Sequence, residues 1–148
     1  MNNKMKIVFR ALAENEAFAR AATAAFVMPL DPTVEELTEI KTAISEAVSN
    51  SVIHGYAGWE DRTQAFVELE CEVSAKGRIV IVVTDHGRGI ADVQEAMQPL
   101  FSTVESEERS GMGFTVMESF MDKLQVQSEE GKGTAVTMTK YLDLVSGL

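Results

Sequence analysis

Cysteine and histidine are scarce in this chain, which has one cysteine and two histidines among its 148 residues. Cys71 cannot form a disulfide within the chain, and its place among alternating apolar residues predicts a buried strand position rather than a nucleophile. His54 and His86, with one cysteine, do not make a cluster of the kind that holds zinc. The sequence therefore points away from a disulfide-stabilised protein, a cysteine enzyme and a zinc protein.

Basic residues are outnumbered by acidic ones. The chain has 13 Lys and Arg against 23 Asp and Glu, a formal net charge of −10 and a pI near 4.6. A surface of this sign repels phosphate backbones and anionic lipid headgroups, so we expect no direct nucleic-acid binding and no membrane binding. An acidic surface does suit a basic protein partner, although acidity alone is common.

Long apolar runs are also missing. The longest, residues 21–30, is about half of the roughly 20 residues that a membrane-spanning helix needs. Arg10 and Glu14 interrupt the N-terminal segment before the apolar core of a signal peptide can form. With 45% hydrophobic residues the chain can build one ordinary core. We expect a single domain over residues 1–148 of a cytoplasmic protein.

The hydrophobic pattern predicts strands and helices in the order β-α-α-β-β-α-β-β. Alternation of apolar and acidic residues predicts a strand at 67–73 with one solvent-exposed face, and the apolar run within 78–84 predicts a central strand. The other elements are expected at 5–10, 124–128 and 134–141 for strands, and at 14–27, 33–54 and 114–123 for helices. This order predicts an α+β fold, a two-layer sandwich with helices on one face of a mixed, mostly antiparallel sheet.

The second predicted helix has distinct end signals. Thr33 and Glu36 form a capping box, in which each side chain can bind the other residue's backbone N–H. An apolar stripe recurs every three or four residues down the helix, and Gly55 is expected to end it in the left-handed conformation. In the alanine-rich helix before it, Phe18 and Phe26 lie on the predicted apolar spacing.

Two short patterns place polar side chains where they could meet a ligand. Glu46 and Asn50 are four residues apart and project from the same side of a helix, as a solvated helix face also would. Asp85 follows a buried strand and precedes Gly87 and Gly89, which let a ligand approach the backbone. Taken alone, an ordinary Asp-Gly turn explains this second pattern equally well.

A further glycine pair, Gly111-Met112-Gly113, directly precedes a predicted helix. The free N–H groups and the positive end of a helix suit phosphate oxygens. The sequence contains no G-x-x-x-x-G-K-[ST] motif, and neither glycine pair has the third glycine of G-x-G-x-x-G. A nucleotide site in this chain is therefore of neither the P-loop nor the Rossmann type.

Taken together, these patterns resemble a known superfamily. Their order and spacing are similar to the GHKL ATPases and kinases through Glu46-x-x-x-Asn50, Asp85-x-Gly87-x-Gly89, Gly111-x-Gly113 and Gly131-x-Gly133-Thr134. The chain also resembles, over nearly its whole length, the anti-sigma F serine kinases of sporulating bacteria, through segments 14–20, 31–33, 39–41, 45–48 and 109–114.

The resemblance implies roles for single residues. It implies that Asn50 ligates Mg²⁺ through its amide oxygen, and that Glu46 is the general base for an attacking serine hydroxyl. Asp85 is expected to bind the adenine amino group, with Thr134 near the same ring. Residues 92–110 correspond to a mobile lid. The implied ATP-binding set is Asn50, Asp85, Gly87, Gly89, Arg109, Ser110, Gly111, Met112, Gly113, Phe114 and Thr134.

The function that the resemblance implies is dual. Such a protein holds a sporulation sigma factor, of the sigma F type, away from RNA polymerase and uses Mg-ATP to phosphorylate a serine of an anti-anti-sigma partner. A homodimer is expected from the same resemblance. Glu16 and Arg20 on the first helix are the candidate docking residues, and an amphipathic helix with an ordinary surface salt bridge explains them equally well.

Three other functions compete with this one. A stress-response anti-sigma serine kinase has the same chemistry with other partners, and a nucleotide-gated binding module has no phosphoryl transfer. The catalytic half of a histidine kinase is disfavoured, because only four residues precede the first predicted strand and leave no room for a helix bearing the phosphorylated histidine. The segment 57–63 with Trp59 receives no role, and His86 and Arg88 occupy variable positions of the glycine loop.

Overall fold

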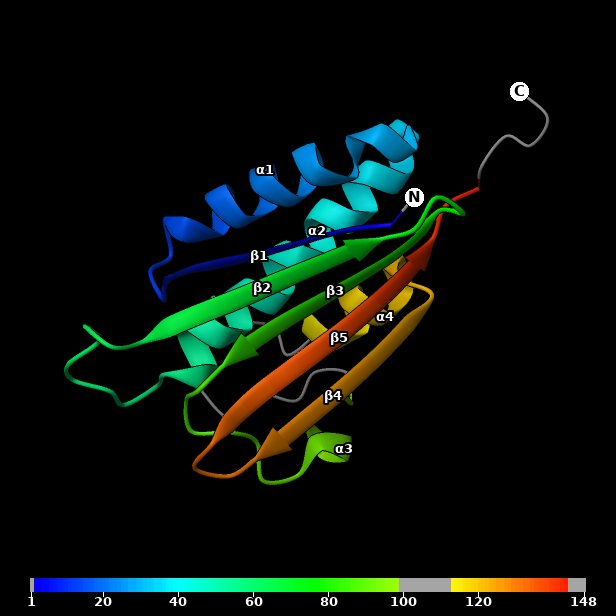
Figure 1. Ribbon diagram of the computed structural model, residues 1–148. Coiled ribbons are helices and arrows are strands. Elements are labelled where there is room, and N and C mark those ends of the chain that lie inside the picture. The colour runs from blue at the N-terminus through cyan, green and yellow to red at the C-terminus, as the bar shows by residue number, and fades with distance from the viewer. Residues whose placement is uncertain (1, 99–112, 144–148) are drawn as a thin grey trace.

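The computed structural model describes residues 2–98 and 113–143. Five strands form one sheet in the order β1-β2-β3-β5-β4 (Figure 1). The strands are β1 (Asn3–Arg10), β2 (Phe66–Val73), β3 (Arg78–Asp85), β4 (Lys123–Glu129) and β5 (Gly133–Tyr141). The α-helices are α1 (Asn15–Val27), α2 (Val34–Asn50), α3 (Val93–Ala96) and α4 (Gly113–Phe120), with a 3-10 turn at η1 (Met28–Leu30) and a π-helical turn at η2 (Ser51–Gly55).

All four strand pairings are antiparallel, so the α+β prediction is confirmed and the expectation of a mixed sheet is wrong. β3 and β4 run in the same direction, but β5 lies between them and pairs with both. β1 and β2 run in opposite directions, and the helices α1 and α2 lie between them in the chain. No two neighbouring strands of the described sheet are therefore parallel.

Helices α1, α2 and α4 cover one face of the sheet, and the core lies between the two layers (Figure 1). α2 packs against both α1 and α4. Its first turn carries the predicted capping box, with the Thr33 hydroxyl accepting from the Glu36 N–H and the Glu36 carboxylate accepting from the Thr33 N–H. The buried residues of α2 are Ile40, Ala43, Ile44, Ala47 and Val48. This helix is thus held at its start and along one side.

The buried face of α1 differs from the predicted one. Ala19, Thr23 and Val27 are buried, whereas Phe18 is 52% exposed and rests edge-on against Phe9. The Thr23 hydroxyl donates to the Ala19 carbonyl of the preceding turn, so this polar side chain is satisfied inside the core. Ala19 and Thr23 are small side chains, which suits the close packing of α1 against α2.

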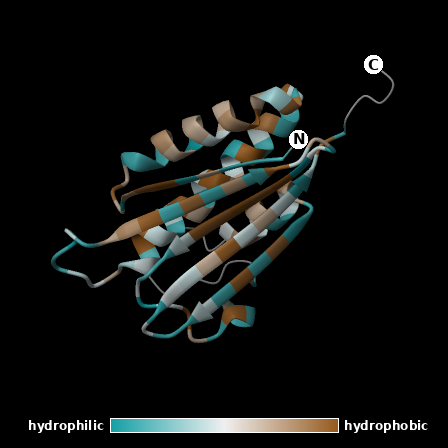
Figure 2. Ribbon diagram, viewed as in Figure 1, coloured by the Kyte–Doolittle hydropathy of each residue, from teal (hydrophilic) through white to brown (hydrophobic). Residues whose placement is uncertain are grey.

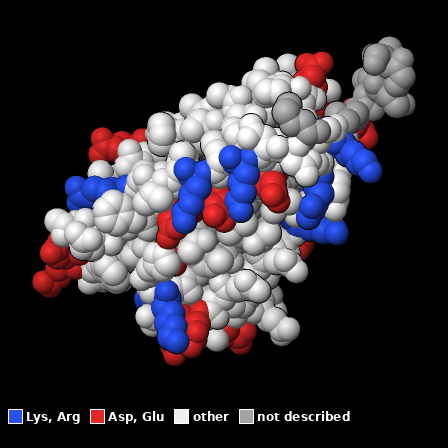
Figure 3. Space-filling view, viewed as in Figure 1, with Lys and Arg blue, Asp and Glu red and all other residues white. Residues whose placement is uncertain are grey.

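The second face of the sheet is not covered by any described helix (Figure 1). β3 is the middle strand, as predicted, and is hydrophobic along most of its length (Figure 2). Acidic and basic side chains gather in a row across the sheet in the space-filling view (Figure 3). The Lys6 ammonium lies 2.7 Å from the Glu68 carboxylate on the neighbouring strand. Cys71 faces the core, and burial raises the pKa of its thiol to about 12, which confirms it as a core residue.

Within the described residues, no helix has both the length and the apolar character needed to cross a membrane.

Candidate functional site

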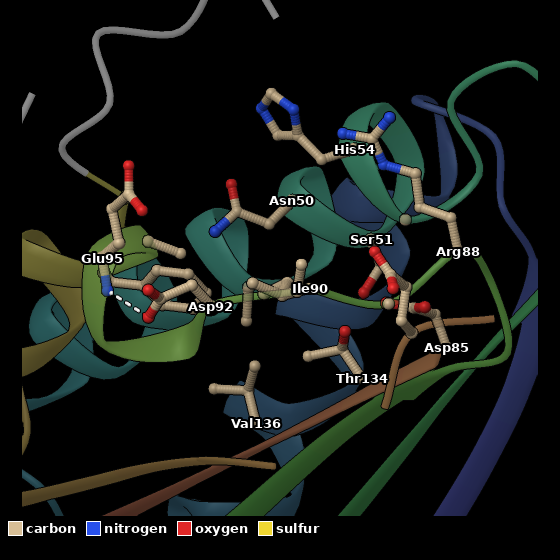
Figure 4. A pocket seen from close by; sticks show the side chains of 18 residues that line it. Asn50, Ser51, His54, Asp85, Arg88, Ile90, Asp92, Glu95, Thr134 and Val136 are labelled. Atoms are coloured by element: carbon tan, nitrogen blue, oxygen red, sulfur yellow. Dashed lines mark hydrogen bonds between the residues drawn. The ribbon is translucent and has the colours of Figure 1, made fainter. Parts of the chain in front are cut away.

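A cavity of about 400 Å³ opens between the end of α2, the loop after β3, and the starts of α4 and β5. In Figure 4 the side chains of Asn50 and His54 lie on one side of it, and those of Asp85 and Thr134 lie on the opposite side. The lining residues are Ala47, Asn50, Ser51, His54, Gly55, Asp85, Arg88, Gly89, Ile90, Ala91, Asp92, Glu95, Ala96, Gly113, Phe114, Glu130, Thr134 and Val136. Segments far apart in the sequence thus meet at one concave site.

Asp85, the last residue of β3, is the most deeply buried carboxylate of this cavity, with 4% of its surface exposed. The Gly87 N–H donates to its Oδ1 at 3.0 Å, and the Ser51 side chain forms a second hydrogen bond. Burial raises the pKa of Asp85, and the hydrogen bonds only partly offset this effect. A desolvated carboxylate of this kind is a strong acceptor for an N–H donor of a ligand.

Gly55 and Gly87 are required where three backbone segments crowd around Asp85. A Cβ atom on Gly55 would lie 2.8 Å from the Asp85 carboxyl carbon, and one on Gly87 would overlap the Gly55 carbonyl group. That carbonyl accepts from the Arg88 N–H at 2.7 Å. Gly55 does not have a positive φ, so the predicted left-handed helix end is wrong. The helix instead runs on through η2, and Gly55 is small because Asp85 passes next to it.

The glycine loop is also tied to the hairpin between β4 and β5. Gly89 has φ +74°, a conformation that favours glycine, and its neighbour Ile90 donates its N–H to the Ser128 hydroxyl at 2.7 Å. The Ser128 hydroxyl in turn lies 2.8 Å from the Thr134 hydroxyl. Gly133 has φ +117°, and a Cβ atom there would overlap the Asp85 backbone carbonyl. The predicted residues Asp85, Gly87, Gly89 and Thr134 therefore form one packed unit.

The predicted helix residues occupy different positions relative to the cavity. Asn50, the last residue of α2, lines it, whereas Glu46 is half-buried one turn earlier and is not among the lining residues. Ala47 and Ser51, on the same stretch of helix, also line the cavity and complete this wall. The structure thus brings Asn50 to the same cavity as Asp85 and leaves Glu46 at its approach.

The phosphate-binding prediction is covered only in part. Gly113 and Phe114 open α4 and line the cavity, so a helix N-terminus is directed at it. Arg109, Ser110, Gly111 and Met112 lie outside the described residues. Of the predicted lid, residues 92–98 are described and include α3, where the Asp92 side chain accepts from the Glu95 N–H at 3.0 Å.

The predicted docking residues Glu16 and Arg20 form an ion pair one helical turn apart on α1. The Arg20 guanidinium also donates to the Ser45 hydroxyl of α2 at 3.1 Å. Arg20 therefore links the two helices as well as pairing along its own helix.

Two residues that support the candidate site were not predicted from the sequence. Ser51 lies within the apolar stripe of the helix, and its hydrogen bond to Asp85 comes from the tertiary approach of β3. Ser128 lies in a predicted terminal strand, and only the pairing of β4 with β5 brings it to the glycine loop. The nearest sequence signal was the four-residue spacing that places Ser51 one turn after Ala47.

Comparisons with known proteins agree with this geometry. The family described as the histidine kinase-like ATPase domain matches residues 9–140. An anti-sigma F factor of Clostridium novyi is 54% identical over 140 residues, which is 95% of each chain. An anti-sigma F factor of Clostridium beijerinckii is 51% identical over 145 residues, covering 98% of this chain and 99% of the relative.

Solved structures show the same fold at much lower identity. A crystal structure of the RsbU and RsbW domains of a Mycobacterium tuberculosis protein covers 95% of this chain with a TM-score of 0.69 and 20% identity, and the chain spans 32% of that protein. A histidine kinase domain from Erythrobacter litoralis matches with a TM-score of 0.54 and 18% identity, and the match covers 86% of this chain and 61% of that domain's chain.

The cavity lies at one end of an antiparallel sheet and is lined by helix ends and a glycine loop. This arrangement belongs to the histidine kinase-like ATPase fold. The chain belongs to the histidine kinase-like ATPase family and, within it, to the anti-sigma F factors.

Proposed function

We propose that this chain binds Mg-ATP in the cavity, retains a sigma F-like factor, and transfers the terminal phosphoryl group of ATP to a serine of an anti-anti-sigma protein. One observation carries the nucleotide part of the proposal: the buried Asp85 carboxylate faces a cavity whose backbone walls are kept close by glycines. The match to an ATPase family supports ATP as the ligand class.

The adenine end of the nucleotide lies at Asp85 in this proposal. The carboxylate accepts a hydrogen bond from the 6-amino group, and the nearby Thr134 hydroxyl adds a second polar contact. Gly87 and Gly89 let their loop pack closely against the backbone of Gly55 and Glu129, and this loop forms part of the wall beside the ring. The cavity volume of about 400 Å³ falls within the range of ligand pockets, roughly 300–1,000 Å³, which supports the fit of a nucleotide.

The phosphate end extends toward Asn50 and the start of α4. The Asn50 amide oxygen is a hard ligand that Mg²⁺ accepts alongside water and phosphate oxygens, and Asn50 lines the cavity, so the residues present fit this ion. When bound, the ion neutralises phosphate charge. The N–H groups of Gly113 and Phe114 bind phosphate oxygens, and Arg109, Ser110, Gly111 and Met112 complete this set in the proposal.

Glu46 acts as the general base in this proposal. Its carboxylate, one turn before Asn50 and half-buried, takes the proton of the serine hydroxyl as that oxygen attacks the terminal phosphorus. The bond between that phosphorus and the bridging oxygen breaks, and ADP leaves. The position of Glu46 beside the cavity rather than inside it suits a group that meets the protein substrate and not the nucleotide.

The partners are proposed on the relatives and on the resemblance. The relatives at 51% and 54% identity are named anti-sigma F factors, which supports a sigma factor as one partner. Glu16 and Arg20 on α1 are the proposed docking residues, and their mutual ion pair must open or be shared when a partner binds. The anti-anti-sigma substrate and a homodimer rest on the resemblance alone.

A phosphoryl-transfer assay tests the proposal. The protein is incubated with labelled ATP, Mg²⁺ and the anti-anti-sigma protein encoded in the same genome, and phosphoserine is measured for the wild type, Glu46→Gln and Asn50→Ala. We expect transfer by the wild type only, with Glu46→Gln still binding ATP. If the wild type bound ATP and the sigma factor but made no phosphoserine, the chain would be a nucleotide-gated binding module and the kinase proposal would be wrong.

A further inference from the structure

Tyr56, which follows η2, is the largest fully buried side chain of the described residues, with 1% of its surface exposed. Its ring packs edge-on against Trp59, with the ring centroids 4.8 Å apart. Its hydroxyl oxygen lies 2.6 Å from the Phe66 carbonyl oxygen and 2.9 Å from the His86 backbone nitrogen. The hydroxyl thus joins the start of β2 to the residue that follows Asp85.

The direction of both hydrogen bonds is fixed. A carbonyl oxygen can only accept, so the Tyr56 proton goes to the Phe66 carbonyl, and a lone pair of the hydroxyl accepts from the His86 N–H. Burial raises the pKa of Tyr56, so its hydroxyl keeps its proton throughout the physiological range. The Tyr56 hydroxyl therefore links His86 to Phe66 in one fixed direction, and we call this pair of hydrogen bonds the relay.

The relay takes the place of the next rung in the ladder between β2 and β3. The two strands pair Val67 with Asp85, so Phe66 and His86 would be the next partners in that antiparallel register. Pairing stops at Asp85 because the Tyr56 oxygen is inserted between the His86 N–H and the Phe66 carbonyl. This wedge ends β3 while giving both the His86 N–H and the Phe66 carbonyl a hydrogen-bond partner.

The wedge also sets where the chain goes next. Once β3 has left the ladder, its chain turns so that the Arg88 N–H reaches the Gly55 carbonyl and the Gly87 N–H reaches the Asp85 carboxylate. Asp85 is the last residue before this turn and is held by strand pairing on both sides. The position of the Asp85 carboxylate therefore depends on where the turn begins.

Arg62 fixes the backbone of Tyr56 by hydrogen bonds to carbonyl groups. Its guanidinium donates to the carbonyls of Tyr56 at 3.0 Å, Val52 at 3.1 Å and Ala11 at 3.3 Å. The Val52 and Tyr56 carbonyls lie in η2 and just after it, where the helix dipole favours a cation, and the Ala11 carbonyl directly follows β1. The segment 57–63, which had no role in the sequence reading, thus supplies a clamp for the tyrosine.

We propose that Tyr56 is a positioning residue of the nucleotide site: its hydroxyl ends the β2–β3 ladder at Asp85 and so holds the Asp85 carboxylate against the 6-amino group of adenine. This inference rests on the proposed function, because it takes Asp85 as the adenine-binding group. It predicts that removing one oxygen atom outside the cavity weakens recognition of one group on the ligand.

Calorimetric titration of two nucleotides separates positioning from general support of the fold. ATP carries the 6-amino group, and purine riboside triphosphate lacks it. We expect Tyr56→Phe, which keeps the ring, to weaken ATP binding by about five- to tenfold, the size of one hydrogen bond, and to change binding of the other nucleotide by less than about twofold. Tyr141→Phe is the matched control, because Tyr141 is the chain's other tyrosine and is exposed at the end of β5.

Each outcome of the titrations leads to one conclusion about Tyr56 or Asp85. Equal losses for both nucleotides, or no loss for either, overturn the role of Tyr56 while the proposed function stands. If the wild type binds both nucleotides equally, the adenine role of Asp85 fails first. Should Tyr56→Phe not fold, 3-fluorotyrosine at position 56 replaces it, because fluorine makes the hydroxyl oxygen a poorer acceptor. A smaller loss of ATP preference is then expected, and an unchanged preference contradicts the inference.

Discussion

Replacing Asp85 by asparagine should change ligand binding and stability in opposite directions. The two side chains have the same shape, so the change removes a buried charge without opening a hole. If the new amide oxygen keeps the hydrogen bond from the Gly87 N–H, the new amide NH₂ takes the place of the other carboxylate oxygen. A donor then faces the adenine amino group, which is itself a donor.

The expected loss of ATP affinity follows from the kind of bond removed. A hydrogen bond to a charged group contributes about 1.5–3 kcal/mol, so Asp85→Asn should raise the Kd for ATP by about ten- to a hundredfold. Titration calorimetry with ATP measures this, and purine riboside triphosphate, which has no amino group to bind, should lose far less.

The expected gain in stability follows from the pKa of Asp85. Burial raises that pKa, so in the native state the charged form costs free energy once the pH exceeds the ordinary carboxyl value. Without ligand at neutral pH, Asp85→Asn should therefore unfold at a higher urea concentration than the wild type. Unchanged ATP affinity, or a less stable ligand-free variant, would refute the reasoning.

Three further predictions address the same site and its supporting helix. First, ATP affinity should fall as the pH is lowered, beginning above the pH at which an ordinary aspartate titrates, because protonation of Asp85 with its raised pKa removes the acceptor; Kd values across a pH series that stay flat down to pH values near 4 would contradict this. Second, Gly87→Ala forces a methyl group onto the Gly55 carbonyl, so it should lower the free energy of unfolding by at least about 1–3 kcal/mol and abolish ATP binding. Gly58→Ala is the control: Gly58 lies in open space at positive φ, so this change should cost about 1 kcal/mol of stability and keep ATP binding. Urea unfolding and ATP titration measure both effects. Third, Thr33→Ala removes the cap of α2 and should lower the free energy of unfolding by about 1 kcal/mol in urea titrations; a large loss of ATP affinity would be unexpected, because the cap lies at the opposite end of α2 from the cavity.

Elements with strong local signals were predictable from the sequence. The capping box at Thr33 and Glu36 and the alternation along β2 depend on neighbouring residues, and both are as expected. The phase of α1 was not, because Ala19 and Thr23 are small enough for close helix packing while Phe18 finds its partner on β1. Such a choice is made by the layer opposite, and residues within the helix do not encode it locally.

The candidate site was predictable as a set of motifs but not in its supporting contacts. Asp85 and the glycines around it could be found from their spacing and resemblance. The reason for Gly55, however, is the approach of Asp85 from another element, and the role of Tyr56 follows from a strand register. These contacts join residues about 30 positions apart through the tertiary fold, where sequence periodicity carries no signal.

The binding of ATP in the cavity beneath α2 is the central claim, and an amide NMR titration with ATP and Mg²⁺ tests it most directly. The claim predicts that the largest shift changes occur at the amides of Gly87, Gly89 and Thr134, around the cavity. Gly77, in the turn between β2 and β3 at the opposite end of the sheet, serves as the internal control and should not change. Saturable shifts centred on Gly77 or on the uncovered sheet face, with the glycine loop unchanged, would contradict the claim.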